Sequence, residues 1–114
     1  MALKPEESLQ IAIVSYFKMQ YPKFKDNLFH VANEGKRTAY YASKMKDMGL
    51  LHGVSDLILV LDKVYFIELK TPKGRLSPYQ KNFQSMCLNQ GHSYKVIRSV
   101  QEFTAFCNYI FKIH

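Results

Sequence analysis

Two short apolar segments, residues 56–61 and 64–70, follow one another almost directly and constrain the fold more than any other feature of the chain. Both are rich in Val, Ile, Leu, Tyr and Phe, which favour β-strands. Only Asp62 and Lys63 separate them, so the two segments predict an antiparallel hairpin. The rest of the fold must cover the apolar side chains of this hairpin.

Three charged side chains interrupt the hairpin where a buried strand should carry none. Asp56 opens the first segment, and Glu68 and Lys70 lie two residues apart in the second, so these two share one face. A buried carboxylate is costly unless it is paired, hydrogen-bonded or bound to a metal ion. These residues therefore mark a candidate site, although a structural ion pair at a strand end remains the alternative.

The length of the turn decides whether the two carboxylates meet. A two-residue turn would pair Leu57 with Glu68 and direct Asp56 to the other face, because side chains alternate along a strand. A three-residue turn over residues 61–63, or a bulge near it, would place Asp56 opposite Glu68. We predict such a turn or bulge.

Two carboxylates that meet across a hairpin offer hard oxygen ligands of the kind that Mg²⁺ prefers. A cation held there would acidify a bound water, and Lys70 could orient or deprotonate that water. The cation would also stabilise charge that develops on a phosphate. The chemistry that these residues favour is therefore phosphodiester hydrolysis.

The remaining periodicity predicts helices around a small mixed sheet. No repeat, low-complexity tract or linker divides the chain, so residues 1–114 are expected to form a single domain. The element order is α-β-α-β-β-α-β-α, with a parallel return to the last strand, and the fold class is α/β. The helices are expected at residues 5–21, 38–48, 78–90 and from 100 onward, and the strands at 28–31, 56–61, 64–70 and 93–98.

Composition narrows the setting and the partner. Sixteen Lys and Arg against nine Asp and Glu leave a formal charge of +7, which favours a polyanionic partner such as nucleic acid. No stretch reaches the length of a membrane span, and no motif indicates an organic cofactor. Cys87 and Cys107 match no metal or redox spacing and are expected to be buried free thiols. We expect a cytoplasmic protein with no membrane partner.

The motifs, taken in order, are more specific than the carboxylates alone. Asp56 followed by Glu68-Leu69-Lys70 resembles the PD-(D/E)xK nuclease signature. Its surroundings are Asn33-Glu34-Gly35-Lys36-Arg37, Met48-Gly49, Gly53-Val54-Ser55-Asp56-Leu57, Phe66-Ile67-Glu68-Leu69-Lys70, Gly74-Arg75-Leu76-Ser77, Gln80 and Val96-Ile97-Arg98. Together they resemble the virus-type replication-repair nuclease (VRR-NUC) domain over nearly the whole chain. The family's usual Pro before the Asp is Ser55 here, and only one arginine of its V-R-R motif is kept, as Arg98.

The resemblance implies a restriction-endonuclease-like core and a Mg²⁺- or Mn²⁺-dependent endonuclease that acts on branched or structured DNA. Small stand-alone members of phages and prophages look like homodimeric Holliday-junction resolvases. A dimer also suits the chemistry, because symmetric resolution of a four-way junction needs two active sites and a two-fold axis supplies them.

The resemblance also implies the roles of individual residues. Glu7 of an E-x-x-Q pattern, Asp56 and Glu68 would be the metal ligands, with Glu6 as the alternative to Glu7. Glu7 could instead stabilise only the start of its helix. Lys70 would position or activate the water, and Gln80 could bridge the site to the scissile phosphate. The residues expected to contact DNA are Lys36, Arg37, Lys44, Lys46, Lys73, Arg75 and Lys81.

Four other functions share much of this pattern. A non-catalytic module that binds structured DNA would need no carboxylates aimed at a phosphate. A flap or nicking nuclease of the same fold would keep the whole site. A restriction endonuclease subunit would need recognition elements that are hard to fit into 114 residues. An exonuclease usually requires a ring or channel around its substrate.

Overall fold

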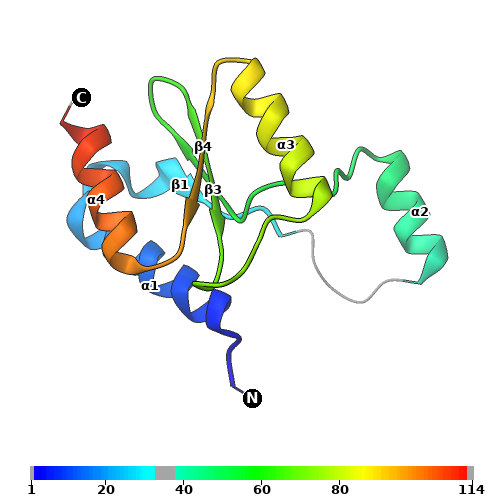
Figure 1. The fold of residues 1–114 in the computed structure, drawn as a ribbon, viewed down its shortest axis with the longest axis horizontal. Coiled ribbons are helices and arrows are strands. Elements are labelled where there is room, and N and C mark those ends of the chain that lie inside the picture. The colour runs from blue at the N-terminus through cyan, green and yellow to red at the C-terminus, as the bar shows by residue number, and fades with distance from the viewer. Residues whose placement is uncertain (1, 33–37, 113–114) are drawn as a thin grey trace.

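A four-stranded mixed sheet forms the centre of the molecule, as the computed structural model of residues 2–32 and 38–112 shows (Figure 1). Its strands lie in chain order and are β1 (Leu28–Phe29), β2 (Leu57–Val60), β3 (Val64–Leu69) and β4 (Ser93–Ile97). β2 is antiparallel to both β1 and β3, whereas β3 and β4 are parallel. The predicted hairpin, parallel return and α/β class are confirmed.

Helices cover the sheet from both sides. α1 (Pro5–Gln20) and α4 (Val100–Phe111) pack on one face, and α3 (Pro78–Asn89) packs on the other (Figure 1). Ser77 and Ser99 cap α3 and α4, since each hydroxyl accepts a bond from the backbone N–H three residues later. The Glu102 carboxylate, however, accepts from the Arg98 amide and not from the cap residue itself.

Two elements differ from the prediction. Residues Pro22–Asn27 form a 3₁₀-helix, η1, where no element was expected. The Pro at its first position ends α1 but suits the start of a new short helix. β1 is two residues shorter than predicted, because the ring Nδ1 of His30 donates to the carbonyl oxygen of Asp56 at the point where the strand pairing ends. A carbonyl only accepts hydrogen bonds, so His30 carries its proton on Nδ1.

The main core lies between the sheet and the α1–α4 layer. Its members are apolar side chains from every strand and from both helices, and the twelve that are buried are Ile13, Phe17, Leu28, Leu57, Leu59, Tyr65, Ile67, Leu69, Ile97, Phe103, Cys107 and Ile110. Along α4, Phe103, Cys107 and Ile110 face inward and are buried, while Phe106 is only partly buried. Both cysteines are buried free thiols, as predicted.

α2 (Ala39–Asp47) stands apart from the other elements (Figure 1). Its Thr38 cap accepts a bond from the Tyr41 amide, so the helix begins where the sequence predicts. No residue of α2 is buried, and Tyr40 and Met48 are among the most exposed apolar side chains of the chain. Within residues 2–32 and 38–112, no helix is both long and apolar enough to cross a membrane.

Candidate active site

The site begins with the register of the β2–β3 hairpin. Val60 pairs with Val64 and Leu57 pairs with Ile67, which leaves a three-residue turn over residues 61–63. The next pair outward in this register is Asp56 with Glu68. The predicted three-residue turn is therefore confirmed, and it brings the two carboxyl groups to the same end and the same face of the hairpin.

Asp56 sits at the entry to β2, where its side chain is partly exposed. Its Oδ2 accepts a hydrogen bond of 2.8 Å from the Leu69 amide, beside the strand residue that carries the second carboxylate. The adjoining Ser55 is buried, and its hydroxyl donates to the Leu57 carbonyl over 3.0 Å. Ser55 therefore supports the turn into β2 without the Pro that the family usually places there.

Glu68 is the most deeply buried charged residue among those the structure describes, with 3% of its surface exposed. Its Oε2 accepts a hydrogen bond of 3.1 Å from the Gln80 amide, whereas its buried Oε1 has no partner in the described part of the protein. Burial, with smaller contributions from the neighbouring Asp56 carboxyl and the charge of Glu6, raises the pKa of Glu68 to about 9. Lys70 acts in the opposite direction. Without a cation, the Asp56–Glu68 pair therefore holds a proton at neutral pH.

Gln80 connects Glu68 to the start of α3. Its side-chain oxygen accepts from the Ser77 amide over 2.8 Å, its amide nitrogen donates to Glu68, and its backbone N–H donates to the Ser77 hydroxyl. With both ends of its side chain held, Gln80 orients the carboxylate. The sequence suggested that Gln80 bridges the site to the scissile phosphate. In the structure its side chain bonds to Glu68.

Lys70 follows the end of β3 and is half-buried. Its backbone N–H donates to the Ile97 carbonyl over 3.1 Å, which continues the pairing of β3 with β4 past the last strand residue. Its charge lowers the pKa of Glu68, so the ammonium group lies within electrostatic reach of the carboxylate pair. This is the position from which a lysine could orient or deprotonate a water.

The two glutamates of the first helical turn differ in their surroundings. Glu7 is exposed, and its Oε1 accepts a hydrogen bond of 2.8 Å from the Lys4 amide at the start of α1. Glu6 is partly buried, and its charge raises the pKa of Glu68. The charge of Glu6 therefore acts on Glu68, whereas Glu7 bonds to the N-terminus of its own helix.

Gly53 joins the two halves of the site. Its φ is +94°, and a Cβ at this position would collide with the backbone carbonyl of Tyr79. The segment before β2 can therefore approach the first turn of α3 only with glycine here. This close approach holds the lead-in to Asp56 against the helix that carries Gln80.

Arg98 organises the loop that follows Lys70. Its Nη1 donates to three backbone carbonyls of that loop, at 2.7 Å to Thr71, 3.3 Å to Pro72 and 2.7 Å to Gly74. Three converging carbonyls were not foreseeable from the sequence, because their meeting depends on how the loop folds. The arginine kept from the V-R-R motif therefore shapes the loop beside the site.

The cations proposed for DNA contact fall into separate groups. Lys73 and Arg75 lie on the loop that Arg98 holds, and Lys81 lies in the first half of α3, so all three are near the site and exposed. Lys44 and Lys46 are exposed on α2, which stands apart from the sheet (Figure 1). Lys36 and Arg37 lie outside the residues that the structure describes, as does the rest of the Asn33–Arg37 motif.

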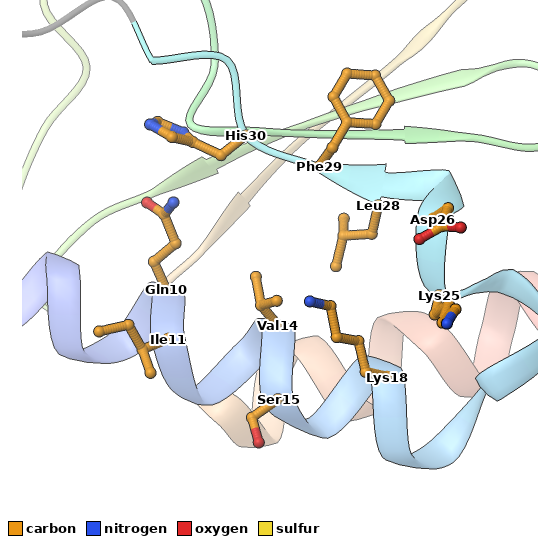
Figure 2. A pocket seen from close by; sticks show the side chains of 10 residues that line it. All are labelled: Gln10, Ile11, Val14, Ser15, Lys18, Lys25, Asp26, Leu28, Phe29 and His30. Carbon is orange, nitrogen blue, oxygen red and sulfur yellow. The ribbon is translucent and has the colours of Figure 1, made fainter.

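A separate groove of about 700 Å³ runs between α1 and β1 (Figure 2). Val14 and Leu28 point towards each other across it, and Gln10 and His30 face each other at one end. The His30 ring also bonds to the backbone of Asp56, so this end of the groove adjoins the backbone that carries one of the two carboxylates. Its lining comes from the α1 side of the sheet, whereas Glu68 bonds to α3, so the groove is distinct from the carboxylate site.

The carboxylate pair fits a divalent cation by the chemistry of its donors. One buried oxygen of Glu68 has no partner among the residues that the structure describes, and its raised pKa means that Glu68 holds a proton that a cation could replace. In the parts of the chain that the structure describes, no three His, Cys, Asp or Glu side chains converge as a metal centre. The donor set thus suits an ion such as Mg²⁺, which accepts one or two carboxylates and keeps several waters.

Comparisons with known proteins agree with this architecture. The family model described as "VRR-NUC domain" matches residues 4–101. A solved structure titled "VRR_NUC domain protein" superposes with a TM-score of 0.81 at 22% identity, covering 100% of this chain and 93% of the other. A second, titled "VRR_NUC domain", gives a TM-score of 0.57 at 17% identity, covering 93% of this chain and 97% of the other. No curated protein matches the sequence.

Proposed function

This chain belongs to the VRR-NUC family, a nuclease-type fold that acts on DNA, and on that premise we propose that it is a Mg²⁺- or Mn²⁺-dependent endonuclease. The observation that carries the proposal is the pairing of Asp56 with the buried, partly unpartnered Glu68. A cation bound between them would act as a Lewis acid on the scissile phosphate and lower the pKa of a bound water. The remaining roles, which are orienting the ligands and positioning the water, fall to side chains of this chain.

Each residue around the pair has a distinct role in this proposal. Asp56 and Glu68 hold the cation, and Gln80 fixes the direction of the Glu68 carboxylate. Lys70 orients the attacking water through its ammonium group, whose charge already reaches the same carboxylate, and only after giving up its own proton can it take one from that water. Of the two glutamates in the first turn of α1, we propose Glu6 as the third acidic group, since its charge acts on Glu68.

The proposed substrate is branched or structured DNA, and the proposed assembly is a homodimer that resolves Holliday junctions. The net charge of +7 and the exposed cations near the site, Lys73, Arg75 and Lys81, favour contact with the phosphate backbone. A chain with one candidate site needs a two-fold partner to cut a four-way junction symmetrically. Two buried free thiols fit a reducing compartment such as the cytoplasm.

The test uses purified protein and a labelled four-way junction, with linear duplex and flap DNA beside it. Each substrate is incubated with Mg²⁺, with Mn²⁺ and with EDTA. We expect paired, symmetric cuts in the junction that require the metal ion. Lys70→Ala should lower the rate by about 10²–10⁴-fold, because general acid–base groups contribute on that scale. Lys63→Ala at the other end of the hairpin is the matched control and should leave the rate unchanged.

The same assay separates the remaining possibilities. A larger loss from Glu6→Gln than from Glu7→Gln would assign the third acidic role, and the reverse order would return it to Glu7. Cleavage of flaps alone would keep the nuclease and discard the resolvase. A monomer by sedimentation would contradict the homodimer. Binding without cleavage in every metal would replace the enzyme by a non-catalytic DNA-binding module.

A further inference from the structure

Tyr94 places a hydroxyl group on the same side of the sheet as Glu68. In the parallel pairing of β3 with β4, Tyr94 is the partner of Phe66, and Glu68 is the partner of the residue two positions further on. Side chains two positions apart share a face, so Tyr94, Phe66 and Glu68 all face α3. The sequence marked Tyr94 only as part of a strand, because its neighbours depend on this register.

The ring of Tyr94 is fixed by packing against α3. Phe83 of α3 meets it edge-on at a centroid distance of 6.2 Å, and meets Phe66 in the same way at 5.0 Å. Aromatic rings in such edge contacts have little freedom to turn. The direction of the Tyr94 hydroxyl is therefore set by the layer between the sheet and α3.

Two buried oxygen atoms on this face lack a partner. Among the residues that the structure describes, the buried side-chain nitrogen and oxygen atoms without a hydrogen bond are the Tyr94 hydroxyl and Glu68 Oε1. Buried polar groups are almost always paired, with protein or with ordered water. Burial raises the pKa of Tyr94 most, and the carboxyl groups of Glu68 and Asp56 raise it further, so all three side chains lie within electrostatic reach of one another.

We propose that the Tyr94 hydroxyl donates, through one buried water, to Oε1 of Glu68 and so acts as a positioning residue for that carboxylate. Buried polar groups without a protein partner are the groups that a buried water typically bridges. Glu68 is then held at both oxygens, by Gln80 at Oε2 and by Tyr94 at Oε1. The consequence for metal binding rests on the proposed function, whereas the hydrogen bond itself does not.

The functional consequence is a carboxylate that is oriented before the cation arrives. Partners that orient a metal ligand typically change metal affinity by 10–100-fold when they are removed. Loss of the Tyr94 hydroxyl should therefore weaken metal binding while the ring, and with it the contact with Phe83, stays in place.

The first experiment measures Mn²⁺ binding by calorimetry for the whole chain and for Tyr94→Phe. We expect the variant to bind Mn²⁺ about tenfold more weakly. Tyr65→Phe is the matched control, because its hydroxyl bonds to Asp62 at the turn end of the hairpin. This control should bind like the unaltered chain. Equal affinity of Tyr94→Phe and the unaltered chain would overturn the proposal.

A second experiment works without metal and separates this inference from the proposed function. In EDTA, Tyr94→Phe should lower the urea midpoint of the chain that has Glu68, but should not lower it in a Glu68→Leu background, where the hydroxyl has no carboxylate to serve. Equal shifts in both backgrounds would overturn the link between Tyr94 and Glu68. A chain that binds no Mn²⁺ yet shows the coupling would refute the metal-dependent function and leave the hydrogen bond standing.

Discussion

The two faces of strand β3 carry different side chains: one face packs against α1 and α4, and the other faces α3. Tyr65, Ile67 and Leu69 face the α1–α4 layer, are at most 3% exposed and belong to the hydrophobic core. On the other face, Glu68 is buried to the same extent but carries a carboxyl group with one unpaired oxygen. The two faces differ in chemistry, and they also differ in burial, because Val64 and Phe66 on the Glu68 face are only partly buried.

The apolar face supports the carboxylate face in two ways, through stability and through strand register. Burying a carboxyl group in the way that Glu68 is buried costs free energy. The apolar face supplies the compensating stability, because buried hydrophobic side chains contribute about 1.5–3 kcal/mol each. It also sets the register that places Asp56 opposite Glu68, since a one-residue slip would turn Ile67 out of the core. The apolar core therefore holds the two carboxyl groups of the site in position.

Truncating a side chain on the apolar face should have the largest effect on the free energy of unfolding. Ile67→Ala should lower the free energy of unfolding by about 2–5 kcal/mol, because a fully buried side chain leaves a cavity in a packed core. Ile58→Ala is the matched control, because Ile58 is only partly buried on the other face of β2. Urea titration measures both variants. An equal cost at the two positions would refute the contrast between the faces.

A methyl group at Gly53 tests how firmly the site face is tied to α3. Gly53→Ala should cost roughly 3 kcal/mol, because it adds backbone strain at a positive φ and a clash with the Tyr79 carbonyl. Gly49→Ala has a similar φ of +103° but open space around it, so it should cost only the strain, about 1–2 kcal/mol. If thermal melts gave the same loss of stability for both variants, the close approach of residue 53 to α3 would not contribute to stability.

The last effect concerns the proton on Glu68. In the metal-free folded chain its pKa is about 9, whereas an unfolded chain has a value near 4.5. Between these values the unfolded state is ionised and the folded state is protonated, so raising the pH favours unfolding. The stability of the chain in EDTA should fall from pH 5 to pH 8.5. Glu68→Gln should remove this dependence and leave the metal-free chain more stable than the unaltered one at pH 8.5.

Urea titrations in EDTA at three pH values check this expectation. Glu102→Gln serves as the control, because this carboxylate lies at the exposed start of α4 and should leave the slope with pH unchanged. A steep fall that persists in Glu68→Gln would assign the pH dependence to other groups.

Local patterns in the sequence predicted most of the elements. The alternating hairpin, the Pro and Ser residues at the start of α3 and the Ser99 cap all act within a few residues of themselves, so their structures are foreseeable. The requirement for an odd turn also followed from alternation alone, once Asp56 and Glu68 were taken as partners. The 3₁₀-helix and the short β1 were not foreseen, because both depend on contacts beyond their own segments.

The sequence by itself therefore determined the α/β class, the hairpin and the two carboxylates that face one another, because periodicity and turn length are local properties of the chain. Only the tertiary structure decided which neighbours those carboxylates have. The charge of Glu6 and the side chain of Gln80 act on Glu68 from α1 and α3, and Tyr94 lies on the same face of the sheet in β4. These elements are distant in the chain, and no spacing within the sequence encodes how they pack around β3.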